Sequence, residues 1–133
     1  MPPPTTPLAP RSDRRILAVW IAYWIALVAA THLPGQQVRR FGLGVSDWLL
    51  HTTAYAGLAA LTWLAVGHRS RSSGWRWMGV LIAFGALDEI TQPLVGRSAQ
   101  LGDWLADAAG VLGVATVWTG VCWAVRKRHA RRR

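Results

Sequence analysis

The sequence predicts an all-α integral membrane bundle of four transmembrane helices with both termini in the cytoplasm, and three observations support this fold class. Apolar residues gather in four blocks, each long enough to cross about 30 Å of hydrocarbon as a helix. Short charged connectors separate the blocks, and their Lys and Arg residues are unequally distributed. Residues 16–30 and 110–125 contain no charged side chain, whereas the helices of a soluble bundle need a polar stripe.

The first predicted span covers residues 16–33 and follows Arg14 and Arg15. The same pattern is typical of a cleavable signal peptide, which would leave a mature chain that starts at Thr31. The length of the apolar run favours a true span instead. The preceding segment is rich in Pro and Thr, so we expect residues 1–15 to form a disordered basic lead in the cytoplasm.

The second, third and fourth spans are predicted over residues 48–66, 75–92 and 104–125, which completes a membrane domain of residues 16–125. Tryptophan opens each of these three spans, and indole rings prefer the headgroup depth of a bilayer. Small residues four positions apart favour close helix packing in the third and fourth spans. These pairs are Gly79 with Ala83, Ala106 with Gly110, and Ala109 with Gly113.

The distribution of Lys and Arg predicts the orientation of the chain. Twelve of the fifteen precede the first span, flank the junction of the second and third spans, or follow the fourth span. Because basic residues favour the cytoplasmic side, both termini are predicted to be cytoplasmic. Residues 126–133, RKRHARRR, then form a polybasic tail that contacts the anionic inner leaflet.

The net charge of +9 does not predict a nucleic-acid partner, because the arginines lie in tails and connectors rather than on one face of a folded domain. Cys122, the only cysteine, lies within the fourth span, so the sequence contains neither a disulfide framework nor a thiol cluster for a metal. Scattered His and carboxylate side chains are weak evidence for a metal site. We therefore predict no metal and no cofactor.

Polar side chains lie at the outer end of each predicted span. An ionised carboxylate near the centre of a span costs roughly 2.5–3.5 kcal/mol, and less near the interface, so such residues usually have a partner or a role. Together they predict one candidate site at the outer membrane surface. The residues are Thr31, His32, Asp47, His51, Tyr55, Asp88, Glu89, Thr91, Gln92, Arg97, Asp103 and Asp107.

The spacing of these residues places several of them on common helix faces. Asp47, His51 and Tyr55 follow one another at intervals of four, and Asp103 and Asp107 repeat this interval. A structural explanation stays open beside the functional one. Asp47 and Asp103 are suited to cap the second and fourth helices, and polar groups near span ends can join neighbouring helices.

Glu89 and Arg97 are predicted to form an ion pair. Glu89 lies within the third span, and Arg97 is the only basic residue of the connector that follows. A partly desolvated carboxylate with a guanidinium partner favours a functional site over a purely structural one.

Three segments, THLPG, SDWLLHTTAYAGLA and GALDEITQPLVGRSAQLGDWLADAAGVLG, resemble the VanZ-like membrane proteins over residues 31–113. The shared pattern is a histidine in the second span, a DExxQ-type end on the third, and GR…D…G leading into the fourth. Family members often have Lys in place of Trp48 and Asn in place of Asp107, so the outer site of this chain is less cationic and more acidic. Carried over by position, the polar set of the family is His51, Tyr55, Asp88, Glu89, Gln92, Arg97, Asp103 and Gly110.

The resemblance implies a multi-pass protein of the bacterial cytoplasmic membrane that acts in the cell envelope. The family is named for a member that gives low-level resistance to the glycopeptide teicoplanin, and it has no settled biochemical activity. We therefore expect a non-enzymatic protein whose outward site contacts membrane lipids and binds a lipid-linked cell-wall precursor, a lipid or a glycopeptide. The small-residue helix faces are compatible with oligomers.

The alternative is an intramembrane enzyme that acts on an envelope lipid or a cell-wall precursor. Glu89 or Asp103 would be the general base, His51 its acid or base partner, and Arg97 a clamp for phosphate or carboxylate. No Gly-x-Ser-x-Gly, HExxH or paired-cysteine motif accompanies these residues. An ion or proton path is less favoured, because no acidic residue continues the set into the cytoplasmic half.

Overall fold

The computed structural model describes residues 14–34, 46–66 and 71–132, and every regular element within these ranges is helical. The all-α prediction is therefore confirmed for this part of the chain. In order, the elements are α1 (Arg14–Thr31), α3 (Asp47–Ala65), α4 (Arg71–Thr91), the short 3-10 helix η2 (Gln92–Val95) and α5 (Leu101–Ala130).

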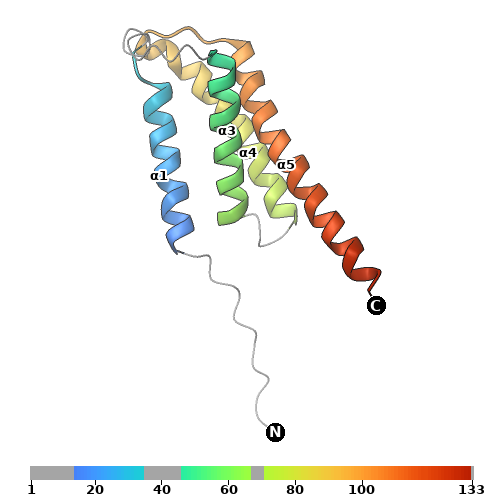
Figure 1. Ribbon diagram of the computed structural model, residues 1–133. Helices are drawn as coiled ribbons and strands as arrows, with labels where there is room; N and C mark the ends of the chain where they lie inside the picture. Colours follow the sequence, from blue (N-terminus) through green and yellow to red (C-terminus); the bar gives the residue numbers. More distant parts are fainter. Residues whose placement is uncertain (1–13, 35–45, 67–70, 133) are drawn as a thin grey trace.

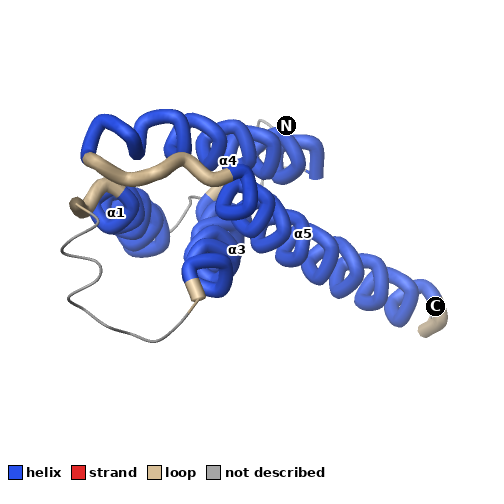
Figure 2. The backbone as a smooth tube through the Cα atoms, turned by 90° about the horizontal axis from the view of Figure 1, so that it is seen from above, coloured by secondary structure: helices blue, strands red, loops and turns tan. Residues whose placement is uncertain are grey.

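The four long helices run alternately up and down the bundle (Figure 1). The start of α1 and the end of α5 therefore lie at one end of the bundle. The end of α1, the start of α3, the end of α4 and the start of α5 lie at the other, which we call the polar end. Seen from above, α3 lies between α1 and α5, while α4 packs against α5 (Figure 2).

Several helix boundaries differ from the predicted spans. Helix α1 already begins at Arg14, so the predicted lead of residues 1–15 is too long, and residues 1–13 lie outside the described residues. Helix α5 continues to Ala130, so most of the predicted tail is helical. Residues 126–130 contain no helix breaker, and Lys and Arg favour the negative end of the helix dipole.

Neither Asp47 nor Asp103 caps its helix, which was the structural explanation left open for these two residues. The hydroxyl of Ser46 accepts a hydrogen bond from the Leu49 backbone N–H and caps α3, while Asp47 is the first residue of that helix. Gln100 is the N-cap residue of α5 and makes no side-chain cap. Asp103 is therefore free to point into the bundle.

The α-helix of the third predicted span ends at Thr91, directly before η2 and Pro93. Pro93 lacks a backbone N–H, so the α-helix gives way at Gln92 to the 3-10 turn of η2. Gly96 follows with a positive φ of 74° and donates its backbone N–H to the carbonyls of Gln92 and Pro93. This turn sends the chain back across the polar end toward α5.

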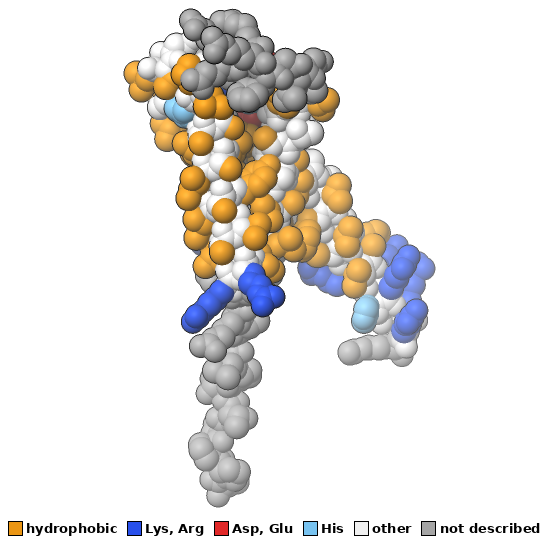
Figure 3. Space-filling model, turned by 60° about the vertical axis from the view of Figure 1, so that its left-hand side comes forward, with side chains coloured by type: hydrophobic (Ala, Val, Ile, Leu, Met, Phe, Trp, Pro, Cys, Tyr) orange, Lys and Arg blue, Asp and Glu red, His pale blue; other side chains and the backbone are white. Residues whose placement is uncertain are grey.

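Three segments are long and apolar enough to cross a membrane: Arg14–Thr31, Ser72–Val95 and Leu101–Ala130. Helix α3 does not meet that criterion, because it carries His51, Tyr55 and other polar residues that are buried among its neighbours. Hydrophobic side chains cover the length of the bundle, and Lys and Arg lie at the end where α1 begins and α5 stops (Figure 3).

Helices α3 and α5 form the most extensive interface of the bundle. Gly110 permits their close approach, since a Cβ atom there would run into the carbonyl oxygen of Thr52. The predicted packing role of Gly110 is therefore confirmed, and Ala106, one turn before it, is buried. A Cβ at Gly79 or Gly113 would meet nothing within 4 Å, so those predicted contacts are absent among the described residues.

Candidate functional site

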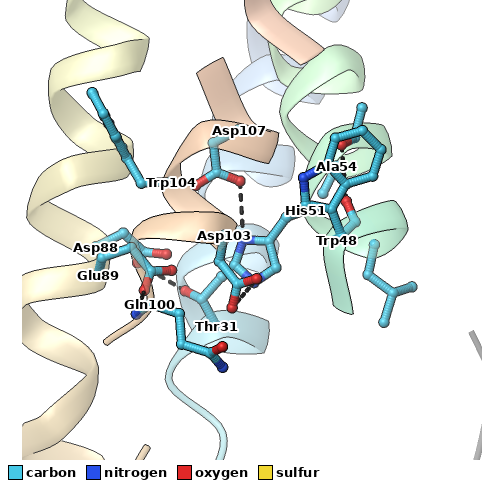
Figure 4. Close-up of polar contacts among 12 residues, drawn as sticks. Thr31, Trp48, His51, Ala54, Asp88, Glu89, Gln100, Asp103, Trp104 and Asp107 are labelled. Atoms are coloured by element: carbon cyan, nitrogen blue, oxygen red, sulfur yellow. Dashed lines mark hydrogen bonds and ion pairs between the residues drawn. The ribbon is translucent and has the colours of Figure 1, made fainter. Parts of the chain in front are cut away.

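Four carboxylates and one imidazole are buried together near the polar end (Figure 4). The exposed fractions are 2% for Asp88, 5% for Glu89, 6% for Asp103 and 0% for Asp107. His51, from α3, is 7% exposed. Because ionised groups are rarely this buried without specific partners, the contacts of each side chain decide what the cluster can do.

His51 lies between two carboxylates of α5. Its Nδ1 atom is 2.9 Å from Oδ1 of Asp107, and its Nε2 atom is 3.8 Å from Oδ2 of Asp103. The two aspartates are four positions apart and so lie on one face of α5, as their spacing predicted. Each nitrogen of the imidazole therefore has a carboxylate partner.

Glu89 joins the end of α4 to the start of α5. Its Oε1 atom accepts a 2.8 Å hydrogen bond from Gln92 Nε2, and its Oε2 atom accepts one of 2.8 Å from the backbone N–H of Gln100. The N-terminus of a helix has backbone donors without helical partners and a positive dipole end. Glu89 supplies both an acceptor and a compensating charge at this point.

Asp88 forms a second group with the end of α1. The Thr31 hydroxyl donates a 2.9 Å hydrogen bond to Asp88 Oδ1, and His32 Nδ1 lies 3.5 Å from the same oxygen. His32 Nε2 is also 3.0 Å from the hydroxyl oxygen of Thr91. These contacts fasten α1 to α4 rather than complete the environment of His51.

The predicted ion pair between Glu89 and Arg97 is wrong. Arg97 Nη1 donates a 3.0 Å hydrogen bond to the backbone carbonyl of Thr31, where it satisfies the C-terminal end of α1. The ion pairs among the described residues all join a histidine to an aspartate. Arg97, the predicted clamp, thus contacts the end of α1.

Several buried acceptors in the cluster have no hydrogen-bond partner among the described residues. They include Oδ2 of Asp107, Oδ2 of Asp88, Oε1 of Gln92 and the hydroxyl of Tyr55. A buried polar atom without a partner costs about 1–3 kcal/mol, so native proteins keep few of them. The cluster therefore has unused capacity to bind a donor or a cation.

Gly85 was not predicted as part of the site, yet its lack of a side chain leaves space for Asp107 and Tyr55. A Cβ atom on Gly85 would lie 3.2 Å from Asp107 Oδ2 and 3.3 Å from Tyr55 Cε1. Glu89 follows Gly85 by one helical turn and so shares its face of α4. Asp107 was predicted among the polar residues of the outer end but was given no catalytic or binding role, although its spacing from Asp103 was a usable signal.

The structure brings together most of the predicted site residues, but in two groups. His51, Glu89, Asp103 and the neighbouring Tyr55 surround Asp107, whereas Asp88 and Arg97 contact the end of α1. Gly110, which the family resemblance added, acts in helix packing. Asp47 is exposed at the start of α3 and lies outside both groups. Comparison with protein-family models, with curated proteins and with solved structures gave no match to this chain.

Proposed function

We propose that the chain is a VanZ-like protein that crosses the bacterial cytoplasmic membrane four times, with both termini inside. Three long apolar helices, the alternation of four helices and the basic residues at one end support this topology. Helix α3 crosses as the inner member of the bundle, where His51, Tyr55 and Thr62 are buried against protein rather than exposed to lipid. The polar end then faces the cell envelope.

The function that the geometry supports best is binding of an envelope ligand at this outward polar end. The ligand class is a lipid-linked cell-wall precursor, a lipid or a glycopeptide. The observation that carries the proposal is the buried group of His51, Glu89, Asp103 and Asp107, in which Oδ2 of Asp107 has no hydrogen-bond partner among the described residues. Such groups are costly in a membrane protein and are typically retained for a role.

The test is expression of the chain in a susceptible bacterium, with teicoplanin susceptibility and precursor binding measured together. Asp103→Asn should reduce both without lowering the amount of protein in the membrane. Asp47→Asn is the matched control, because Asp47 lies near the same end but is exposed. Equal values for the two variants and the unmodified chain would refute the proposal.

A second candidate is an intramembrane enzyme that acts on an envelope lipid or precursor. The placement of His51 between Asp107 and Asp103 favours it, because a carboxylate that orients an imidazole is a common acid–base arrangement. Conversion of a labelled precursor by the purified protein, abolished by His51→Gln, would distinguish this function from binding.

A further inference from the structure

One histidine and two carboxylates from three different helices converge within the buried cluster. A ligating atom from each of His51, Glu89 and Asp107 lies within 4.8 Å of the other two, and all three side chains are buried. Tetrahedral coordination with bonds of about 2.1 Å would place such atoms roughly 3.4 Å apart. These three atoms are therefore at most about 1.4 Å farther apart than they would be around a bound ion.

We propose that His51, Glu89 and Asp107 form a binding site for a divalent transition-metal cation such as Zn²⁺ or Mn²⁺. A mixed set of one imidazole and two carboxylates suits these ions better than a purely hard or a purely soft cation. The 2.9 Å between His51 Nδ1 and Asp107 Oδ1 is already short enough for both atoms to bind one ion.

The charge of the cluster supplies an independent argument. Glu89, Asp103 and Asp107 surround a single imidazole, so full ionisation would leave the group negative even with His51 protonated. Within the described ranges no Lys or Arg forms an ion pair with these carboxylates. A divalent cation would compensate the charge that burial makes unfavourable.

The unpartnered oxygen of Asp107 points to the same conclusion. Its Oδ2 atom is buried, lies close to Gly85 of α4, and has no hydrogen-bond partner among the described residues. Asp103, 3.8 Å from His51 Nε2, is placed to orient the imidazole from its other side. Metal-bound histidines usually have such a partner on the second nitrogen.

Three protein ligands leave a coordination position open for a group from outside the protein. An oxygen of a phosphate or carboxylate head group fits that position, and a bound cation removes the repulsion that this acidic site would exert on an anion. The nature of this fourth ligand rests on the proposed function, whereas the metal site does not.

The direct test uses the full chain purified without a histidine tag, with Cys122→Ser to remove the thiol. The protein is stripped with a chelator and titrated separately with Zn²⁺, Mn²⁺ and Mg²⁺, and bound metal is measured by calorimetry and elemental analysis. We expect one equivalent of Zn²⁺ or Mn²⁺ per chain. Asp107→Asn and Glu89→Gln should each weaken binding at least about tenfold.

Two control variants replace an acidic residue and a histidine that lie at the polar end but outside the proposed metal site. Asp47→Asn and His32→Gln should bind as the parent does, because neither residue contributes to the three-ligand group. Equal binding by the Asp107→Asn variant, or no binding of any of the three cations by the folded parent, would overturn the proposal.

X-ray absorption of the Zn²⁺-loaded parent provides a measurement that does not depend on the folding of any variant. A first shell with one nitrogen and at least two oxygens at about 2.0–2.2 Å is expected. A shell without nitrogen would overturn the assignment. If the parent binds the metal but Asp103→Asn changes neither precursor binding nor susceptibility, the proposed function is refuted and the proposed metal site still holds.

Discussion

His51 on α3 and Asp107 on α5 are joined by a 2.9 Å contact between Nδ1 and Oδ1, with 7% and 0% of the two side chains exposed. The pair lies in the interface between the two helices that pack most extensively. The candidate site therefore lies within the main helix interface, and a substitution in one should affect the other.

A double-mutant cycle measures how strongly this pair is coupled. His51→Ala and Asp107→Ala should each lower the free energy of unfolding by about 1–3 kcal/mol, because each leaves a buried partner unsatisfied. The double variant should be less destabilised than the sum, by about 0.5–1.5 kcal/mol. Unfolding in detergent provides the values, and additivity within error would contradict the contact.

Gly110→Ala should destabilise the bundle by about 1–3 kcal/mol, because the added methyl group meets the Thr52 carbonyl oxygen in the α3–α5 interface. Gly113→Ala is the matched control on the same helix, since its methyl group would meet no atom within 4 Å. Thermal unfolding of both variants is the measurement. Equal midpoints would show that the close approach at Gly110 is unimportant.

Arg97→Gln should weaken the attachment of the end of α1 to the bundle and leave the group of His51, Glu89, Asp103 and Asp107 unchanged. The substitution removes the hydrogen bond from Nη1 to the Thr31 carbonyl, worth about 0.5–1.5 kcal/mol. Hydrogen exchange should become faster in the last turn of α1, while Zn²⁺ affinity remains that of the parent. A loss of metal binding with unchanged hydrogen exchange would show that Arg97 acts on the residues around His51 and not on the end of α1.

The proposed orientation predicts which side of the membrane each end of the bundle faces. In a Cys122→Ser background, Ser98→Cys should react with a membrane-impermeant maleimide in intact cells, because residue 98 lies at the polar end and is exposed. Arg132→Cys, exposed after the end of α5, should react only after lysis. The opposite pattern would invert the topology and place the polar end in the cytoplasm.

The local features of the fold were predictable because short stretches of sequence determine them. Long apolar runs predicted the helices, and the third predicted span ended at residue 92, directly before Pro93, where the structure has the turn of η2. Local reasoning failed where two partners compete for one group. Arg97 was expected to bind Glu89, but the Thr31 carbonyl lies within its reach and the Gln100 N–H satisfies Glu89.

By itself the sequence determined the helical class, the helix positions to within a few residues, and the gathering of polar residues at one end. These features follow from the order of hydrophobic and charged residues along the chain, which short stretches of sequence determine. Only the tertiary structure decided that His51 meets Asp107 and that Gly85 faces both Asp107 and Tyr55. Those contacts depend on which helix faces come together, and close packing at Gly110 selects one rotation of α5 against α3.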